Sequence, residues 1–127
     1  MGENMITAYE KYYPEENIEV GDLVCLVPNT EAVKLAFNGF KDKSSKVIGI
    51  CTKIENNLIY VINTGIVDVN VEGLTCIGDN ITSSNIPGKA QCIRYEQDKS
   101  IFNIRSIGKI IQLYNNCNKV KVILNIK

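Results

Sequence analysis

The sequence predicts an all-β fold, a single barrel- or sandwich-like domain with little helix. Short apolar runs alternate with turn residues along most of the chain, as in small β domains. No segment keeps a 3.6-residue hydrophobic period beyond two turns. The chain also repeats itself, because IEVGD at 18–22 corresponds to TCIGD at 75–79, and VIGI at 47–50 corresponds to SIGK at 106–109. We therefore expect a β domain over 18–127 that is built from two related halves, 18–65 and 66–127.

Two asparagine pairs extend this repeat. Asn56-Asn57 lies seven residues after Gly49, and Asn115-Asn116 lies seven residues after Gly108. Each pair leads into an apolar run, LIYVI at 58–62 and VKVIL at 120–124. Asparagine tolerates the positive φ angles of tight hairpin turns, so each pair predicts a β-hairpin.

Residues 1–17 are expected to form an N-terminal arm. Pro14 and the acidic pair that follows it break any helix there. Tyr9, Tyr12 and Tyr13 fit one face of a short helical turn, or an aromatic patch that packs on the domain or on a sister chain. Stacking on a ligand is the alternative role of these rings.

In the first half, strands are expected within 20–28 and around 33–37, where Val33, Leu35 and Phe37 alternate with other residues. A single helical turn that starts at Thr30 competes with the second of these strands. The lysine-rich run at 41–46 reads as a solvated loop. A further strand over 46–54 should place Ile48, Ile50 and Ile54 on one face, and the Asn56-Asn57 turn should return the chain through 58–62.

In the second half, the clearest alternation lies at 67–72. Three valines there should face one way, and Asp68, Asn70 and Glu72 should face the solvent. Segments 90–95 and 101–104 should pair across a polar loop, and 107–113 should pair with 120–126. The last strand carries Lys119, Lys121 and Lys127, a charge pattern that is typical of an edge strand.

Composition narrows the range of functions. Fourteen basic and fourteen acidic residues balance, so no global field attracts nucleic acid or anionic lipid. No apolar run approaches the roughly 20 residues that a membrane span needs, and the first 17 residues lack the apolar core of a signal peptide. We therefore expect a protein made in the cytoplasm, with neither nucleic acid nor membrane as a partner.

The absence of histidine argues against most enzymes. It removes Ser-His and Cys-His pairs and most zinc and iron sites. Five cysteines, none closer than sixteen residues to the next, form no CxxC motif, and an odd number does not make a disulfide framework. Cys25, Cys51 and Cys76 lie in apolar runs and are expected to be small buried hydrophobes. No metal and no cofactor are expected.

Two Gly-Asp dipeptides and one Pro-Gly dipeptide are interpreted as structural turns. In Gly21-Asp22 and Gly78-Asp79, the glycine suits a positive φ and the aspartate accepts backbone N–H groups in the turn. Pro87-Gly88 is a strong turn dipeptide. The string GDNITSSNIPGKA at 78–90 contains neither a phosphate-binding GxxxxGK[ST] nor a nucleophile GxSxG motif.

The string GDNITSSNIPGKA, followed by SIGK and VKVIL, carries a resemblance to a known module. In bacteriophage tail fibres, spikes and head appendages, and at the C-terminal ends of some bacterial proteins, it reads GD-x-L-x-x-S-x-x-PG-x-A and then IGK. The positions filled in this chain are Gly78-Asp79, Ile81, Ser84, Pro87-Gly88, Ala90 and Ile107-Gly108-Lys109. The similarity covers about 66–126. The segment from YYPEENIEVGDLVCLV to VIGI resembles the first half of the same module, as in the appendage domains grouped with the G2 autoproteolytic peptidases.

The resemblance implies a homo-oligomer, most often a homotrimer, and some members of the group are intramolecular chaperones that cut themselves from the fibre. Carried over to this chain, the candidates for such cleavage are Ser83 or Ser84 as nucleophile, with Lys89 or Asp79 as partner. A Ser-Lys pair needs a desolvated lysine, and the polar loop around Lys89 does not predict one.

The leading hypothesis is therefore a non-enzymatic structural or assembly module of a phage or prophage particle, which oligomerises through strand faces. Its partners would be copies of itself and other particle proteins. The alternative is a module that binds a cell-surface glycan or a protein through aromatic rings. The candidate rings are Tyr9, Tyr12, Tyr13, Phe40, Tyr95 and Tyr114.

Overall fold

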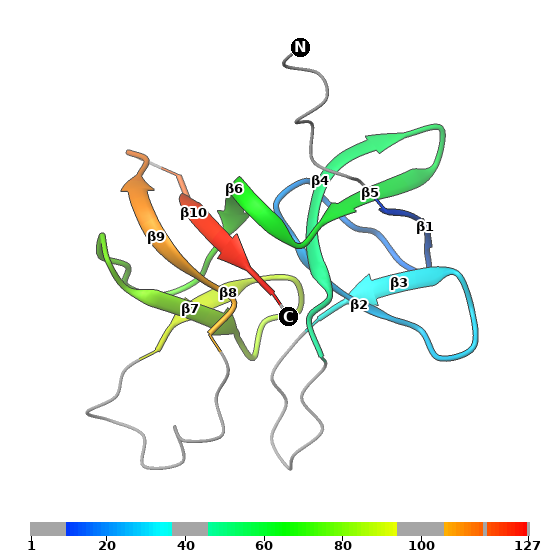
Figure 1. Ribbon diagram of the computed structural model, residues 1–127, viewed down its shortest axis with the longest axis horizontal. Coiled ribbons are helices and arrows are strands. Elements are labelled where there is room, and N and C mark those ends of the chain that lie inside the picture. Colours follow the sequence, from blue (N-terminus) through cyan, green and yellow to red (C-terminus); the bar gives the residue numbers. More distant parts are fainter. Residues whose placement is uncertain (1–9, 37–45, 94–105, 116, 127) are drawn as a thin grey trace.

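The computed structural model describes residues 10–36, 46–93, 106–115 and 117–126. All helix or strand elements in these ranges are strands, which confirms the all-β prediction. They form two five-stranded units that lie side by side (Figure 1). The first half contains β1 (Glu10–Pro14), β2 (Leu23–Leu26), β3 (Ala32–Leu35), β4 (Gly49–Glu55) and β5 (Leu58–Ile62). The second half contains β6 (Thr64–Asn70), β7 (Asn80–Ser83), β8 (Ala90–Cys92), β9 (Gly108–Leu113) and β10 (Lys119–Asn125).

The two halves share one strand order. The first half is a closed barrel in the order β1-β3-β2-β4-β5, and the second is a sheet in the order β6-β10-β9-β7-β8. In the first half, the parallel pairing of Pro14 with Val33 joins β1 to β3. A single parallel bridge between Val71 and Ala90 joins the corresponding ends in the second half. Both halves therefore follow the same path, and the second is closed by one bridge.

The Gly-Asp turns are built from the same hydrogen bonds in both halves. Gly21 and Gly78 have φ angles of +97° and +94°. In the first turn, the Gly21 N–H donates to Cys51 O at 2.7 Å, the Asp22 N–H to Glu19 O at 3.1 Å, and the Cys51 N–H to Asp22 O at 2.9 Å. The second half repeats these bonds as Gly78 N–H to Ile110 O at 2.8 Å, Asp79 N–H to Cys76 O at 3.1 Å and Ile110 N–H to Asp79 O at 2.9 Å.

Each half also contains a long hairpin with a β-bulge at the same place. In β4–β5 the pairing register shifts between Cys51 and Lys53, and in β9–β10 it shifts opposite Lys121 and Val122. Asn56 and Asn57 have φ angles of 54° and 65°, as a tight hairpin turn requires. The bulge interrupts the alternation of β4. Ile54 is therefore exposed whereas Ile50 is buried, and the prediction that these two residues lie on one face is wrong.

Part of the expected N-terminal arm belongs to the barrel. Residues 10–14 form β1, which pairs with β5 and β3, so the helical-turn alternative for Tyr12 and Tyr13 is wrong. Lys11 of β1 pairs with Tyr60 of β5, and Asp68 of β6 pairs with Lys121 at the equivalent place of β10. Strand β1 of the first half therefore corresponds to β6 of the second. The sequence hides this strand because its Tyr-Tyr-Pro run lacks the valine alternation of β6.

The last strand is not an edge strand. β10 lies between β6 and β9 in the sheet. Its lysines have other roles, because Lys121 lies opposite Asp68 and the Lys119 ammonium binds across the junction between the halves. The edge prediction was wrong because a sequence does not reveal which strands flank a given strand.

The hydrophobic core lies in two clusters. One is confined to the first half and contains Val24, Val33, Cys51, Ile59 and other apolar residues. The larger one joins most of the second half to residues from the first, including Leu23, Ala36, Ile50 and Ile62. This shared core makes the two halves a single domain.

The cysteines are divided between the core and the surface. Cys25, Cys51 and Cys92 are buried, and burial raises the pKa of the Cys51 thiol to about 11. Cys76 and Cys117 are exposed. The prediction that Cys76 is buried is wrong, because it lies in the turn before β7 rather than in a strand.

Candidate functional site

A buried polar cluster lies at the junction between the halves. Asp22 is only 4% exposed, and its carboxylate accepts hydrogen bonds from both sides of the junction. The Glu19 N–H of the same half donates to Asp22 Oδ2 at 2.9 Å. Asn70 Nδ2 of the second half donates to Asp22 Oδ1 at 2.8 Å. A buried carboxylate is costly unless it is hydrogen-bonded, so this cluster ties the halves in one relative position.

Lys119 completes the cluster. Its Nζ donates to Asn70 Oδ1 at 2.6 Å and to Val20 O at 3.0 Å. The Asn70 N–H also donates to Gly21 O, at 2.8 Å. The Val20-Gly21 turn of the first half is thus seated on the end of β6 and the start of β10. Asn70 was predicted to face solvent, and it is buried because this turn covers it.

The Pro87-Gly88 turn forms a second part of the junction. Gly88 has a φ of +83°, its N–H donates to Ala36 O at 2.8 Å, and its carbonyl accepts the Leu23 N–H at 2.9 Å. A side chain at position 88 would lie 2.8 Å from Leu35 Cδ2. The turn therefore requires glycine both for its backbone angle and for its close approach to the first half.

The structure does not place the candidates for self-cleavage in a Ser-Lys pair. The Ser84 hydroxyl lies 2.7 Å from Lys89 O and 3.1 Å from Ile86 O, and it accepts the Ile86 N–H at 3.2 Å. The Lys89 ammonium lies 3.8 Å from Asp22 Oδ1. Ser83 is buried in β7, and Asp79 belongs to the second Gly-Asp turn. Among the described residues, no hydrogen bond joins either serine hydroxyl to Lys89 Nζ.

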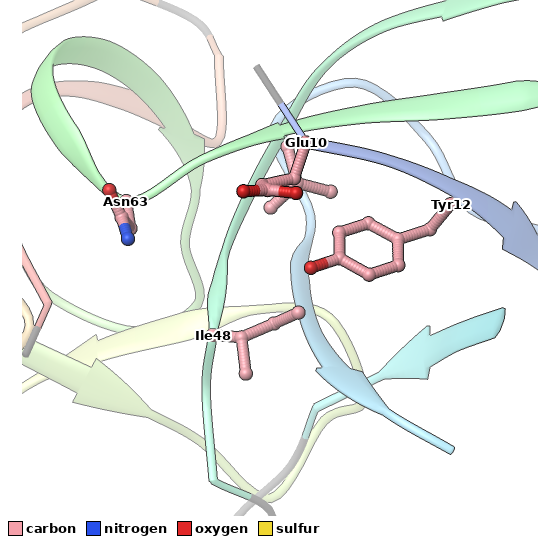
Figure 2. A pocket seen from close by; sticks show the side chains of 5 residues that line it. Glu10, Tyr12, Ile48 and Asn63 are labelled. Atoms are coloured by element: carbon pink, nitrogen blue, oxygen red, sulfur yellow. The ribbon is translucent and has the colours of Figure 1, made fainter. Parts of the chain in front are cut away.

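Tyr12 lines a pocket of about 380 Å³ at one side of the first half (Figure 2). The other lining residues are Glu10, Ile48, Val61 and Asn63. Figure 2 shows the Tyr12 hydroxyl, the Glu10 carboxylate and the Asn63 amide around this space, with Ile48 below them. Partial burial, and then the nearby Glu10 charge, raise the pKa of the Tyr12 phenol. The pocket thus combines an aromatic ring, polar groups and apolar walls.

Of the other candidate aromatic residues, Tyr13 and Tyr114 are described, and neither lines this pocket. The Tyr114 hydroxyl donates to Asp68 Oδ1 at 2.7 Å in the second half, and this bond raises the pKa of Tyr114. Tyr13 is 59% exposed on β1. Tyr9, Phe40 and Tyr95 lie outside the described residues. The structure therefore distributes the predicted aromatic set over both halves.

Among the residues that the structure describes, the most exposed large aliphatic side chains lie between β6 and β7. Leu74 is 84% exposed, Ile77 is 65% exposed, and Cys76 is exposed between them. A second apolar pair, Ile66 and Ile123, lies cross-strand on the outer face of β6 and β10. Sequence reasoning missed both surfaces because an exposed isoleucine and a buried one look alike in a sequence.

Metal-binding clusters and membrane-spanning helices were sought in the part of the chain that the structure describes. There, no group of three or more Cys, Asp or Glu side chains is placed to hold a metal ion. No described helix is long and apolar enough to cross a membrane.

Comparison with known proteins identifies a shared fold. No family model matches the sequence, and no curated protein matches it. Among solved structures, the chain is similar to the N base of the head fibre protein gp8.5 of bacteriophage phi29. The TM-score is 0.58, with 11% sequence identity, over 96% of this chain and 97% of that one. Both chains therefore share one architecture over almost their whole lengths.

Proposed function

We propose that this chain is a non-enzymatic structural module of a phage or prophage particle and that it assembles with copies of itself as a homotrimer. The observation that carries the proposal is the fold likeness to the N base of a phage head fibre protein, which extends over nearly all of both chains. The module pattern at 78–90 supports it independently from the sequence.

The role would be passive. The exposed side chains of Leu74 and Ile77 form apolar surface that sister chains would bury. Burial of such surface on association stabilises the assembled form in proportion to the area removed from water. The Ser84 hydroxyl holds a turn in the main chain, so its observed contacts favour a structural role over self-cleavage.

A second candidate function is glycan binding at the Tyr12 pocket. The ring and the polar groups of Glu10 and Asn63 form the combination that binds sugars, with one stacking face and several hydrogen-bonding partners. Titration with simple sugars would test it: binding that is lost in Tyr12→Ala would support a glycan-binding role, and no binding would oppose it.

The mass in solution tests the leading proposal. Light scattering behind a size-exclusion column, at two protein concentrations, should give a mass near three times 14.2 kDa. Apolar burial between chains predicts that this mass persists on dilution. A clean monomer at both concentrations would contradict the assembly role and leave binding functions to be tested.

A further inference from the structure

The Gly-Asp turn contact between the halves is made by the first-half turn alone. The first-half turn Val20–Asp22 is seated on the second half, where Asn70 and Lys119 receive it. Its counterpart in the second half is Ile77–Asp79. A Cβ atom added to Gly21 would lie 2.8 Å from Asn70 Oδ1, whereas one added to Gly78 would meet nothing within 4 Å.

The surface of the second half that receives the turn also has a counterpart in the first half. Strand pairing locates it: Tyr12 pairs with Ile59 in the first half, and Val69 pairs with Val120 at the equivalent place in the second half. The next positions in this register are Tyr13 and Leu58 in the first half, and Asn70 and Lys119 in the second. Tyr13 is 59% exposed, and its N–H donates to Glu31 O in its own half at 3.0 Å.

A two-fold relation between the halves would seat each turn on the other half. Within the described part of the chain, only the first-half turn is seated on the other half. The contact is therefore heterologous: it joins two different surfaces, and their counterparts do not meet each other within the chain. The unused turn lies at the left edge of the molecule in Figure 1, where the chain enters β7, and β1 lies towards the right. The two unused surfaces are thus at opposite ends of the chain's two units.

The unused surfaces have matching chemistry. The receiving surface that is used within the chain is polar, because it contains Asn70 and Lys119. The corresponding residues of the first half, Tyr13 and Leu58, are largely apolar. The second-half turn also carries one more apolar side chain, because Leu74 stands where the first half has Asn17, and Ile77 stands where it has Val20. The apolar side chains of this turn and of this receiving surface suit each other.

We propose that the turn 73–78 of one copy docks on the Tyr13-Leu58 surface of a second copy, and so repeats between chains the contact that joins the halves within a chain. The proposal rests on the self-assembly proposed above and assigns its surfaces. Heterologous contacts generate a ring where the rotation closes. Three chains would then form a ring of six related β units, in which every unit contacts two neighbours.

Paired cysteines test this docking. In a Cys76→Ser/Cys117→Ser background, Ile77→Cys is combined with Tyr13→Cys or, separately, with Leu58→Cys. Disulfides require Cβ atoms about 4 Å apart, so mild oxidation should link chains only where these surfaces meet. We expect covalent dimers and trimers on a denaturing gel without reductant. Ile77→Cys with Ile123→Cys is the matched control, and linkage there in preference to both test pairs would overturn the proposal.

A second variant distinguishes between a wrong assignment of the docking surface and an absence of self-assembly. Leu74→Ser/Ile77→Ser removes two exposed side chains, so the fold should persist and the assembled mass should fall to that of a monomer. Ile66→Ser, at a similarly exposed position outside the turn, should keep the wild-type mass. An assembled wild type with an equally assembled Leu74→Ser/Ile77→Ser variant would overturn the docking and leave self-assembly standing. A monomeric wild type would overturn both.

Discussion

Alanine at Gly49 or Gly108 is expected to destabilise the protein by about 3 kcal/mol, the upper part of the usual range for overpacking a core. A Cβ atom on Gly49 would lie 2.5 Å from Ile62 O and closer still to Val61 Cγ1. One on Gly108 would lie 2.5 Å from Val122 Cγ1 and 2.6 Å from Ile123 O. Because backbone oxygens are involved, neither hairpin can relieve the clash by a change of rotamer. The free energy of unfolding, from urea denaturation followed by circular dichroism, measures the effect.

Gly73→Ala is the matched control for this prediction. Gly73 has a φ of +80°, but a Cβ atom there would meet nothing within 4 Å. The substitution should cost only the backbone strain of a left-handed residue, roughly 1–2 kcal/mol. If Gly49→Ala and Gly108→Ala cost no more than Gly73→Ala, the close packing within the two hairpins would be contradicted.

Asp22→Ala is expected to cost about 3 kcal/mol, because it leaves buried donors without an acceptor. The substitution removes the acceptor of the Glu19 N–H and of Asn70 Nδ2, and it removes the carboxylate 3.8 Å from the Lys89 ammonium. Asp79→Ala, at the corresponding and partly exposed position of the second half, should cost less because water can reach the groups it leaves. Urea denaturation of the two variants gives the comparison.

A double-mutant cycle shows whether Asp22 acts through the junction. The combined cost of Asp22→Ala and Asn70→Ala should be smaller than the sum of their separate costs by about 1–2 kcal/mol, because each substitution already breaks the bond between these side chains. Strict additivity would mean that the two side chains do not stabilise the junction together.

Local features of the fold could be predicted from the sequence. The Asn56-Asn57 turn was predictable because few residues accept its two positive φ angles. The two Gly-Asp turns were recognisable because glycine and aspartate meet specific needs of the backbone. The strand at 58–62 was found with its observed bounds, since its apolar run ends at clear turn residues.

The features that the sequence hid depend on contacts between distant segments. Asn70 alternates with valines as a solvent-facing residue would, and only the seating of Val20-Gly21 buries it. The bulge at β4 exposes Ile54 although the apolar pattern continues through it. The strand at 10–14 shows no strand pattern of its own, and its equivalence to β6 is visible only from the pairing. The candidate assembly surfaces belong to this class too, because an exposed Ile77 and a buried isoleucine look alike in a sequence.

The comparison and the geometry support different parts of the account. The likeness to the head fibre base shows a shared fold, since it extends over both halves. The one-directional junction supports a specific mode of assembly, because it leaves one turn and one receiving surface unused.

Electron microscopy of the assembled protein tests most directly whether the junction within the chain is repeated between chains. Class averages of the purified complex should show a closed ring with two similar lobes per chain, and six lobes for the mass of a trimer. Every lobe should contact two neighbours. A complex in which each chain keeps one lobe outside the contact region would contradict the account, because its copies would then associate through a surface unrelated to the junction.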